Sequence, residues 1–411
     1  MERILFLLAA AFSVARAQRC ASLTSFDCYS PGLYPQQNAT QARCEAHGCC
    51  WRPGQSPACV YAALAAPAAA ACSSVTTASR VDCHPEPSAS PENCTARGCC
   101  WDPAAAAAAA GAGAVGGVSA CFYPRTDGYV GAAPVATSVG FNQSLTLAGA
   151  PTYFGGDAPS LVLSVEYQTQ TRAHFSITDP SDPARWRIPP GLVVRAPPPG
   201  ARAAATDYSV TVTQAPEAFG VLVVRTSSGS GQVLFDSRAE TASGQMVNGL
   251  VWQRQYVEIS SSLPEDAGGA THIFGLGEHS APFQLPHNYS GPDAAGNIYT
   301  AWARDQPGIP VEQPGGGQNL YGDHPLYMVH DPSTGEAFGV LMLNSNAKDV
   351  LLQPGAAITW RLTGGVVDVY IFTGPSPQQV VEQYGTPCDT RDELYSPSSP
   401  PTRYAPAPSR S

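Results

Sequence analysis

Cysteine is the residue type whose number and spacing in this chain carry the clearest chemistry. Twelve of the 13 cysteines fall into two sets of six, and each set contains a Gly-Cys-Cys-Trp motif. The first set is Cys20, Cys28, Cys44, Cys49, Cys50 and Cys59, and the second is Cys72, Cys83, Cys94, Cys99, Cys100 and Cys121. Two even sets predict two disulfide frameworks, although six cysteines alone allow about fifteen pairings. Adjacent cysteines without paired Cys-x-x-Cys spacing fit zinc poorly, so we expect no metal.

Several histidines and carboxylates invite a catalytic interpretation that their context does not favour. The Gly275–His279 segment contains Gly-x-Gly but lacks the third glycine and the strand–helix unit of a nucleotide-binding loop. We interpret Glu278 and His279 as a structural hydrogen-bonding pair at a strand end. No nucleophile motif accompanies Asp323-His324, so loop packing is the favoured interpretation there. Asp368 lies in a Val/Ile run, which predicts a buried, hydrogen-bonded carboxylate with a structural role.

The sequence predicts that short β-strands position these residues. Only 13% of the residues are charged, and glycine and proline each number 39, a mixture that suits a turn-rich all-β body. Between Tyr129 and Tyr384, β-branched runs alternate with turn residues, and long amphipathic helical periods are missing. The expected strands include 161–167, 208–213, 219–225, 233–235, 256–259, 338–343 and 366–372. Many short strands of this kind predict one large β-sandwich or barrel.

The termini and two alanine-rich runs have separate interpretations. Residues 1–17 carry an apolar run followed by Ala15-Arg16-Ala17, which predicts a cleaved signal peptide. No later run reaches the ~18 apolar residues of a membrane span. The runs Ala62–Ala71 and Ala104–Ala110 are interpreted as linker or loop. The Pro/Ser-rich tail from Gly385 is expected to be disordered. The expected division is signal peptide 1–17, first module 18–61, linker 62–71, second module 72–124, β-domain 125–384 and tail 385–411.

Charge and modification signals narrow the partners and the compartment. The net charge of −10 argues against nucleic acid, which requires basic stripes. Sequons at Asn38, Asn142 and Asn288 predict glycosylation. Together with the disulfides, they place the protein in the secretory pathway, with an extracellular or lysosomal/vacuolar destination.

Each cysteine set resembles a trefoil, or P-type, domain. The diagnostic stretch is Asn93–Trp101, followed by Cys121-Phe122-Tyr123, and Arg80 before Cys83 also matches the family. The resemblance implies the pairs Cys20–Cys50, Cys28–Cys49, Cys44–Cys59, Cys72–Cys100, Cys83–Cys99 and Cys94–Cys121. Trefoil clefts bind glycans, and Trp51 and Trp101 could stack on sugars, but packing on the disulfides is the favoured interpretation for both.

The β-body resembles the N-terminal, galactose mutarotase-like β-sandwich domain of glycoside hydrolase family 31. The matching stretches, in order, are Phe175–Pro180 with Arg185–Pro189 as a strand pair, Phe219–Val221 with Val233–Asp236, Gly275–His279, Trp302–Asp305, Asn319–Pro325, Gly339–Val350 and Thr363–Phe372. The family comprises retaining α-glucosidases, which carry paired catalytic Asp residues on a (β/α)8 barrel of about 250 residues.

The resemblance also implies what this chain does and does not carry. The match stops within a few residues of Tyr384, so we expect the barrel to be absent, assign no catalytic residue and no cofactor, and predict no hydrolysis by this chain. In the family the loop that holds Arg304 and Asp305 reaches over the barrel mouth. These two residues are therefore the substrate-binding candidates.

Two functional hypotheses remain open from the sequence. In the first, the chain is the carbohydrate-binding N-terminal part of an α-glucosidase, it binds an α-glucan or other glycan, and a longer form supplies the barrel. In the second, it is a secreted, non-catalytic trefoil protein that binds glycans or mucin-like partners. Cys388, an odd thirteenth cysteine, favours the first hypothesis, because an unpaired thiol is uncommon in a secreted protein.

Overall fold

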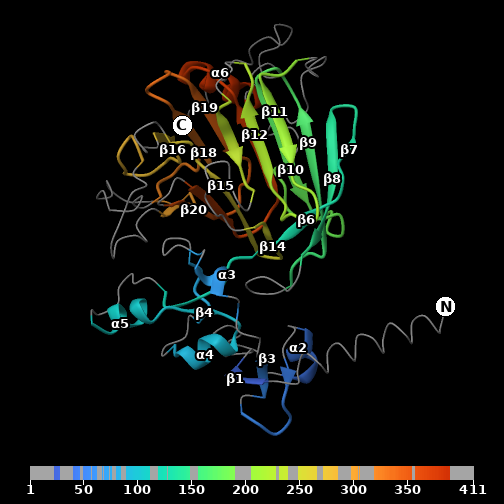
Figure 1. The fold of residues 1–411 in the computed structure, drawn as a ribbon, viewed down its shortest axis with the longest axis vertical. Helices are drawn as coiled ribbons and strands as arrows, with labels where there is room; N and C mark the ends of the chain where they lie inside the picture. Colours follow the sequence, from blue (N-terminus) through green and yellow to red (C-terminus); the bar gives the residue numbers. More distant parts are fainter. Residues whose placement is uncertain are drawn as a thin grey trace, which may run out of the picture.

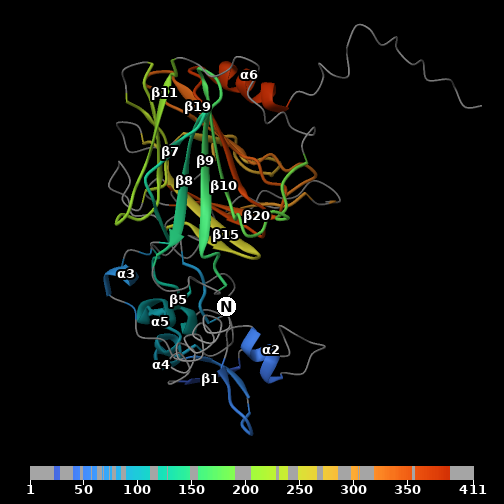
Figure 2. The ribbon, with the colours of Figure 1, turned by 90° about the vertical axis from the view of Figure 1, so that its right-hand side faces the viewer.

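The structure is a computed structural model that combines two small disulfide-rich modules with a large body of β-sheets (Figure 1). It describes residues 23–27, 40–46, 50–56, 58–62, 67, 69–73, 75, 80–84, 89–111, 119–126, 128–148, 156–189, 205–227, 231–238, 249–265, 272–285, 298–303, 305, 319–353 and 357–388. The modules and helix α6 (Pro377–Cys388) lie at opposite ends of the body in both views (Figures 1 and 2). The expected signal peptide lies outside the described residues. The mainly-β fold class is confirmed.

The two modules share one local plan. Each contains a short helix followed by a two-residue Cys-Trp strand and then a strand that begins at the last cysteine. These elements are α2 (Gln41–Ala46), β2 (Cys50–Trp51) and β3 (Cys59–Ala62) in the first module, and α4 (Pro91–Ala96), β4 (Cys100–Trp101) and β5 (Cys121–Phe122) in the second. The pairing register is the same, since Trp51 faces Cys59 and Trp101 faces Cys121. The first module adds β1 (Leu23–Asp27) beside β3.

The second alanine-rich run, Ala104–Ala110, forms a helix, which corrects the loop interpretation there. Residues Pro103–Gly111 are helix α5, inserted between β4 and β5. Alanine has the highest helix propensity, Pro103 suits the first helical position, and the Asp102 carboxylate accepts a hydrogen bond from the Ala104 amide at 2.8 Å. The expected linker likewise ends in a short helix, α3 (Ala69–Ser73).

A nine-stranded sheet forms one wall of the body. Its strands are β6 (Tyr129–Gly131), β7 (Val135–Ala136), β8 (Gly140–Leu147), β9 (Ser160–Tyr167), β10 (Arg172–Thr178), β16 (Ile273–Gly275), β18 (Leu326–His330), β19 (Ala337–Met342) and β22 (Val367–Phe372). The order is β16-β18-β19-β22-β10-β9-β8-β6, with β7 beside β8. All of these pairings are antiparallel. The sheet therefore brings strands from both halves of the chain side by side.

Two smaller sheets complete the body. The five-stranded sheet has the order β14-β15-β21-β20-β17, and the three-stranded sheet has the order β11-β12-β13. Their strands are β14 (Val251–Gln253), β15 (Tyr256–Ser262), β17 (Ile298–Ala301), β20 (Lys348–Gln353), β21 (Ala357–Leu362), β11 (Tyr208–Val212), β12 (Val221–Arg225) and β13 (Val233–Asp236). Every strand expected from the periodicity is present. Arg185–Pro189, in contrast, is not a strand: Arg185 donates instead to the Gln253 carbonyl at 2.9 Å and lies over the Trp252 ring.

Aromatic side chains join the three sheets in one hydrophobic core. Phe175 meets Phe235 edge-on at 5.3 Å between ring centroids, and Tyr327 lies 6.4 Å from Trp360. Helix α6 covers a second cluster on the nine-stranded sheet with Val380 and Tyr384. α6 continues past the expected boundary at Tyr384 to Cys388.

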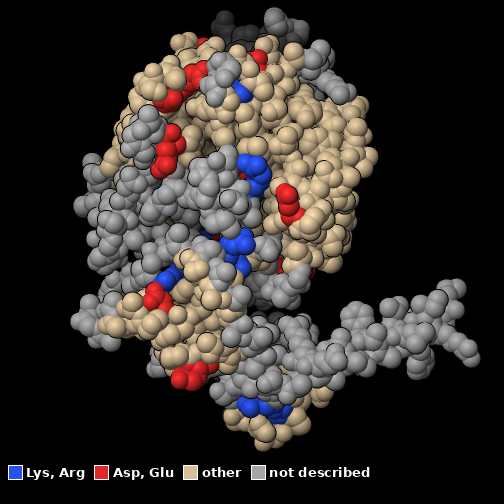
Figure 3. All heavy atoms as spheres, in the orientation of Figure 1, with Lys and Arg blue, Asp and Glu red and all other residues tan. Residues whose placement is uncertain are grey.

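The described part of the chain does not show the alternation of helices and strands typical of a (β/α)8 barrel. None of its helices has the length and apolar character of a transmembrane segment. The longest, α6, has 12 residues, and the strands follow one another through turns and loops. The face drawn in Figure 3 shows acidic and basic side chains scattered among the described residues.

Candidate functional site

The candidate sugar contact Asp305 lies just after strand β17, on a loop at one end of the five-stranded sheet. Its side chain is exposed, while the other candidate, Arg304, lies outside the described residues. The neighbouring Trp302 side chain is 64% exposed. Its backbone amide donates to the side-chain oxygen of Asn319, which fixes the start of the loop.

Asn319 ties three segments together at this point. Its amide nitrogen donates to the carbonyl oxygens of Glu278 at 3.3 Å and Gly322 at 3.1 Å. Its oxygen holds the Trp302 amide, as described above. A buried side-chain amide with its donors and acceptor occupied rigidifies the surrounding loops. The exposed Trp302–Asp305 loop therefore begins at a fixed support.

The Gly275–His279 segment lies beside the base of this loop, since a His279 ring nitrogen lies 3.0 Å from the Thr300 carbonyl oxygen and His279 pairs with Asn319. Gly275 has φ +109°, and a Cβ there would lie 2.4 Å from the Leu326 carbonyl oxygen, so only glycine fits. Leu276 adopts a φ of +53°, a conformation that costs a non-glycine residue energy and persists only where the surroundings enforce it. The segment is thus shaped by its packing and leaves no room for a phosphate-binding loop.

Glu278 and His279 have structural roles, as expected, but they do not form a pair with each other. The Glu278 carboxylate accepts from the Gly322 amide at 2.7 Å. The two ring nitrogens of His279 lie 2.6 Å from the Leu276 carbonyl oxygen and 3.0 Å from that of Thr300. The correction has a physical reason: the two side chains bond to backbone groups, of the same segment at Leu276, of β17 at Thr300 and of the following loop at Gly322, instead of to each other.

Lys348 supports the same loops from below. It is the only lysine in the sequence, its side chain is 0% exposed, and its Nζ lies 2.5 Å from an Asp323 carboxylate oxygen. Burial lowers the pKa of Lys348, and the Asp323 carboxylate opposes that shift. The Asp323-His324 loop therefore packs onto β20, as the loop interpretation expects, and does not form part of a triad.

Three other acidic side chains, from these loops and from β20, make structural bonds. Glu278 holds Gly322, Asp323 holds Lys348, and Asp349 accepts from the Thr300 hydroxyl at 2.7 Å. Among the described residues of the loop, Asp305 offers an exposed hydrogen-bond acceptor and Trp302 an exposed aromatic face. A carboxylate accepts hydrogen bonds from hydroxyl groups and an aromatic ring offers an apolar face, so the two groups together suit a polyhydroxylated ligand.

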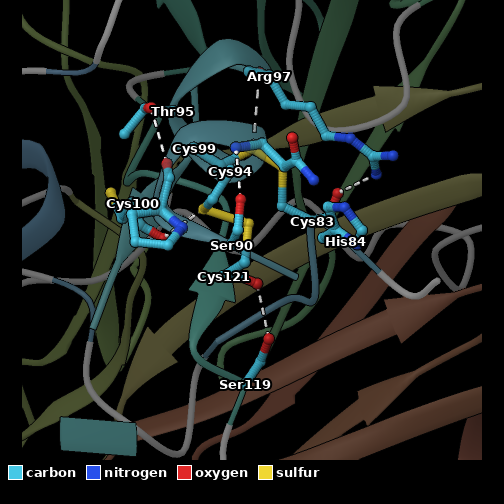
Figure 4. The surroundings of a disulfide bond; sticks show 12 residues. Cys83, His84, Ser90, Cys94, Thr95, Arg97, Cys99, Cys100, Ser119 and Cys121 are labelled. Carbon is cyan, nitrogen blue, oxygen red and sulfur yellow. Dashed lines mark hydrogen bonds between the residues drawn. A yellow bond between two sulfur atoms is a disulfide. The ribbon is translucent and has the colours of Figure 1, made fainter. Parts of the chain in front are cut away.

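The modules carry the cross-links that the trefoil resemblance implies, wherever both cysteines are described. The structure joins Cys44–Cys59, Cys72–Cys100, Cys83–Cys99 and Cys94–Cys121, with Cα–Cα distances of 5.6, 5.6, 6.5 and 5.7 Å. Figure 4 shows the surroundings of Cys83, Cys99, Cys94 and Cys121 in the second module. Cys50 is also disulfide-bonded, while Cys20, Cys28 and Cys49 lie outside the described residues. The sulfurs of Cys83, Cys99 and Cys121 lie within 4.8 Å of one another, but all three are in disulfides and cannot supply the thiolates that zinc needs.

The second module is also held by Arg80, which the resemblance singles out. Its guanidinium lies 2.7 Å from the Asp102 carboxylate and 4.1 Å from the centroid of the Phe122 ring. The hydrogen bond from Arg80 lowers the pKa of Asp102. Trp101 packs half-buried against the disulfide cluster, so its position agrees with packing as the favoured interpretation.

One expected glycosylation site can be placed on the structure. Asn142 and Ser144 of its sequon are both exposed on β8, on the same side of the strand. The sequons at Asn38 and Asn288 lie outside the described residues. Asn142 therefore has the accessibility that a glycan requires.

Comparison with known proteins finds family matches in the second module and in the β-body. The family model for the trefoil (P-type) domain matches residues 72–124. That for the glycosyl hydrolase 31 N-terminal galactose mutarotase-like domain matches residues 165–349. The chain is 39% identical over 251 residues to the lysosomal alpha-glucosidase of Mus musculus, covering 60% of this chain and 22% of the relative. It is 33% identical over 350 residues to the intestinal sucrase-isomaltase of Rattus norvegicus, covering 85% and 14%.

The chain spans less than a quarter of the length of these two curated relatives. A crystal structure of the glucosidase II alpha subunit aligns with a TM-score of 0.44 at 15% identity, covering 64% of this chain and 34% of that one. The segment 165–349 matched by the second family model includes Asp305, Asn319 and Lys348.

Proposed function

We propose that the chain is the carbohydrate-binding N-terminal part of a retaining α-glucosidase, because it carries a trefoil domain and the N-terminal galactose mutarotase-like domain of glycosyl hydrolase 31. The observation that carries the proposal is the exposed Asp305 beside Trp302, on a loop whose base is fixed by Asn319. Asp305 would accept hydrogen bonds from the hydroxyls of an α-glucan, with Arg304 as a second contact. The domain boundaries expected from the sequence belong to this proposal, with the β-domain extended to Cys388.

The proposal assigns binding, and not bond cleavage, to this chain. Retaining hydrolysis needs two carboxylates about 5 Å apart, one as nucleophile and one as acid/base. The carboxylates of Glu278, Asp323 and Asp349 are occupied by Gly322, Lys348 and Thr300. Each of them would have to abandon a structural bond to act on a substrate held by Asp305.

The compartment follows from the modules. A disulfide-rich trefoil part fits the secretory pathway, and the relatives named above include a lysosomal and an intestinal glycosidase. We propose an extracellular or lysosomal destination for this chain. The alternative of a non-catalytic, glycan-binding trefoil protein is less well supported, because Trp101 packs on the disulfide cluster instead of presenting its face to a ligand.

The test measures binding and turnover on the same purified chain. Titration with maltotriose, followed by NMR or calorimetry, should show weak binding that Asp305→Ala reduces by about 10- to 100-fold, since a hydrogen bond to a charged group contributes roughly 1.5–3 kcal/mol. Asp182→Ala is the matched control, because Asp182 is an exposed aspartate on another loop. Maltose and a chromogenic α-glucoside should show no turnover at acidic or neutral pH. Equal affinity in wild type and Asp305→Ala would refute the binding role, and turnover that survives repurification would refute the assignment of binding alone.

A further inference from the structure

A second group of ionisable side chains lies far from the Asp305 loop, on the nine-stranded sheet. His174 on β10 is 5% exposed and stands between the neighbouring strands β9 and β22. Its Nδ1 lies 3.1 Å from a Glu166 carboxylate oxygen, and its Nε2 lies 2.7 Å from an Asp368 oxygen. The strand register brings the three together, since His174 faces Glu166 on one side and Tyr370 on the other.

The surroundings of His174 are defined on each side. From β22, the Tyr370 ring stacks on the imidazole at 4.3 Å between centroids. From the segment after β10, Arg187 lies 3.6 Å from the second Asp368 oxygen, with its own side chain 42% exposed. From the end of β9, the Gln168 amide donates to the same Glu166 oxygen at 2.9 Å. The charged groups around the imidazole are therefore two carboxylates and one guanidinium.

Both ring nitrogens of His174 face carboxylate oxygens, which only accept hydrogen bonds. A neutral imidazole has one N–H and one lone pair, so one of the two contacts would place a lone pair against a carboxylate. A protonated imidazole donates to both. With His174 protonated, its charge and that of Arg187 balance the two carboxylates. With His174 neutral, the cluster keeps a net negative charge around Asp368, whose side chain is 0% exposed, and such a charge is costly in a buried site.

We infer that Glu166, His174 and Asp368 form an acid-stabilised clasp, which holds strands β9, β10 and β22 most firmly at mildly acidic pH and loosens at neutral pH. The inference goes beyond carbohydrate binding, because no residue of the clasp belongs to the Asp305 loop. It describes a β-domain adapted to an acidic compartment. β22 leads directly into α6, so the outer face of the sheet would respond to the loosening.

The direction of the pH effect follows from both titrating groups. Burial lowers the pKa of His174, but the hydrogen bonds that its ring donates to Asp368 and Glu166, together with the negative charges of these carboxylates, exceed that effect and leave the pKa raised above its ordinary 6.5. Its contribution to folding is complete below pH 6.5 and is lost as the pH rises through the raised value. The hydrogen bond with His174 lowers the pKa of Glu166 below its ordinary 4.5, so that contribution is complete above pH 4.5 and is lost in stronger acid. The clasp is therefore strongest between pH 4.5 and 6.5.

The test compares unfolding of the full chain in urea at pH 5.5 and pH 7.5, with the disulfides intact. The wild-type folding equilibrium constant should be larger at pH 5.5 than at pH 7.5 by up to about tenfold, which is the most that one histidine with an ordinary pKa of 6.5 in the unfolded chain can contribute over this interval. His174→Gln should abolish most of this difference. His330→Gln is the matched control, because His330 lies at the end of β18 outside the cluster, and it should behave like wild type. Equal stability at both pH values, or greater stability at pH 7.5, would overturn the inference.

Two further measurements keep the inference testable if His174→Gln does not fold. Glu166→Gln keeps the shape of its side chain, is partly exposed, and should reduce the pH difference without removing it. NMR of protein labelled in its histidine rings should show one imidazole that stays protonated above pH 6.5 and is missing from His174→Gln or shifted in Glu166→Gln. A His174 ring that loses its proton below pH 6.5 would refute the clasp directly.

Discussion

Removing Lys348 from beneath the Asp305 loop should destabilise the β-domain by about 2–3 kcal/mol. Lys348→Met keeps the length and apolar stem of the side chain but leaves the Asp323 carboxylate without its ion pair at 2.5 Å. Removing one partner of a fully buried pair costs roughly 3–5 kcal/mol, because the remaining charge stays desolvated. The Asp323 side chain is 18% exposed, so water replaces part of the lost interaction, and we therefore expect a value below the full range.

The double variant separates the ion pair from simple packing. Lys348→Met combined with Asp323→Asn leaves no charge at the site, and exchange of a buried ion pair for neutral groups is often close to neutral in stability. We expect the double variant to lie within about 1 kcal/mol of wild type, so that the coupling energy has the size expected for contacting residues, up to ~3 kcal/mol.

Urea unfolding followed by tryptophan fluorescence provides the assay, since Trp360 and Trp252 are buried in the β-body and the intact disulfides keep the modules from contributing large changes. Two outcomes would refute the reasoning. One is a loss below about 1 kcal/mol for Lys348→Met, and the other is a double variant at least as unstable as the sum of the single changes.

Two other perturbations test the body and the modules. Gly128→Ala should lower the free energy of unfolding by about 2–4 kcal/mol, because Gly128 has φ +65° and a Cβ there would lie 2.1 Å from the Leu250 carbonyl oxygen. The control Gly156→Ala, with φ +75° and open space around it, should lower it by only about 1–2 kcal/mol. Equal losses of stability for the two variants in thermal melts would contradict the steric argument. Cys100→Ser removes the bridge to Cys72, which spans 28 residues and contributes about 3–4 kcal/mol to stability. Limited proteolysis with non-reducing peptide mapping should show that the second module is cleaved and the first stays intact. Cleavage of both modules would show that they do not fold separately.

The sequence predicts the parts of this fold that depend on local pattern. Alternation of apolar and polar residues locates strands such as Ser160–Tyr167 and Tyr208–Val212 to within a residue or two, because period two is a property of the strand itself. The alanine-rich stretch shows the limit of interpreting composition. Its low complexity suggests a loop, while its intrinsic propensity and the Asp102 cap produce helix α5.

The supports of the candidate site could not be predicted in this way. Asp305 is found through a family resemblance, but Asn319 and Lys348 carry no signal in their own neighbourhoods. Their partners lie on other segments, as when Asn319 reaches back 41 residues to the Glu278 carbonyl. The sequence separation is larger still in the His174 cluster, where 194 residues separate His174 from Asp368. Asp368 alone was identifiable as buried from its Val/Ile surroundings, and its partner was not.

The burial of Lys348 should make the folded chain unreactive at lysine toward reagents that modify amines. As the sequence has no other lysine and this one is 0% exposed, acylating or reductively methylating reagents should find the terminal amine and little else on the folded chain. Modification of Lys348 requires the Asp323 loop to lift away from β20, so its rate reports how often that loop opens. A single isotopically labelled lysine would accordingly give one resonance, a built-in probe of the Asp305 loop that needs no engineered label.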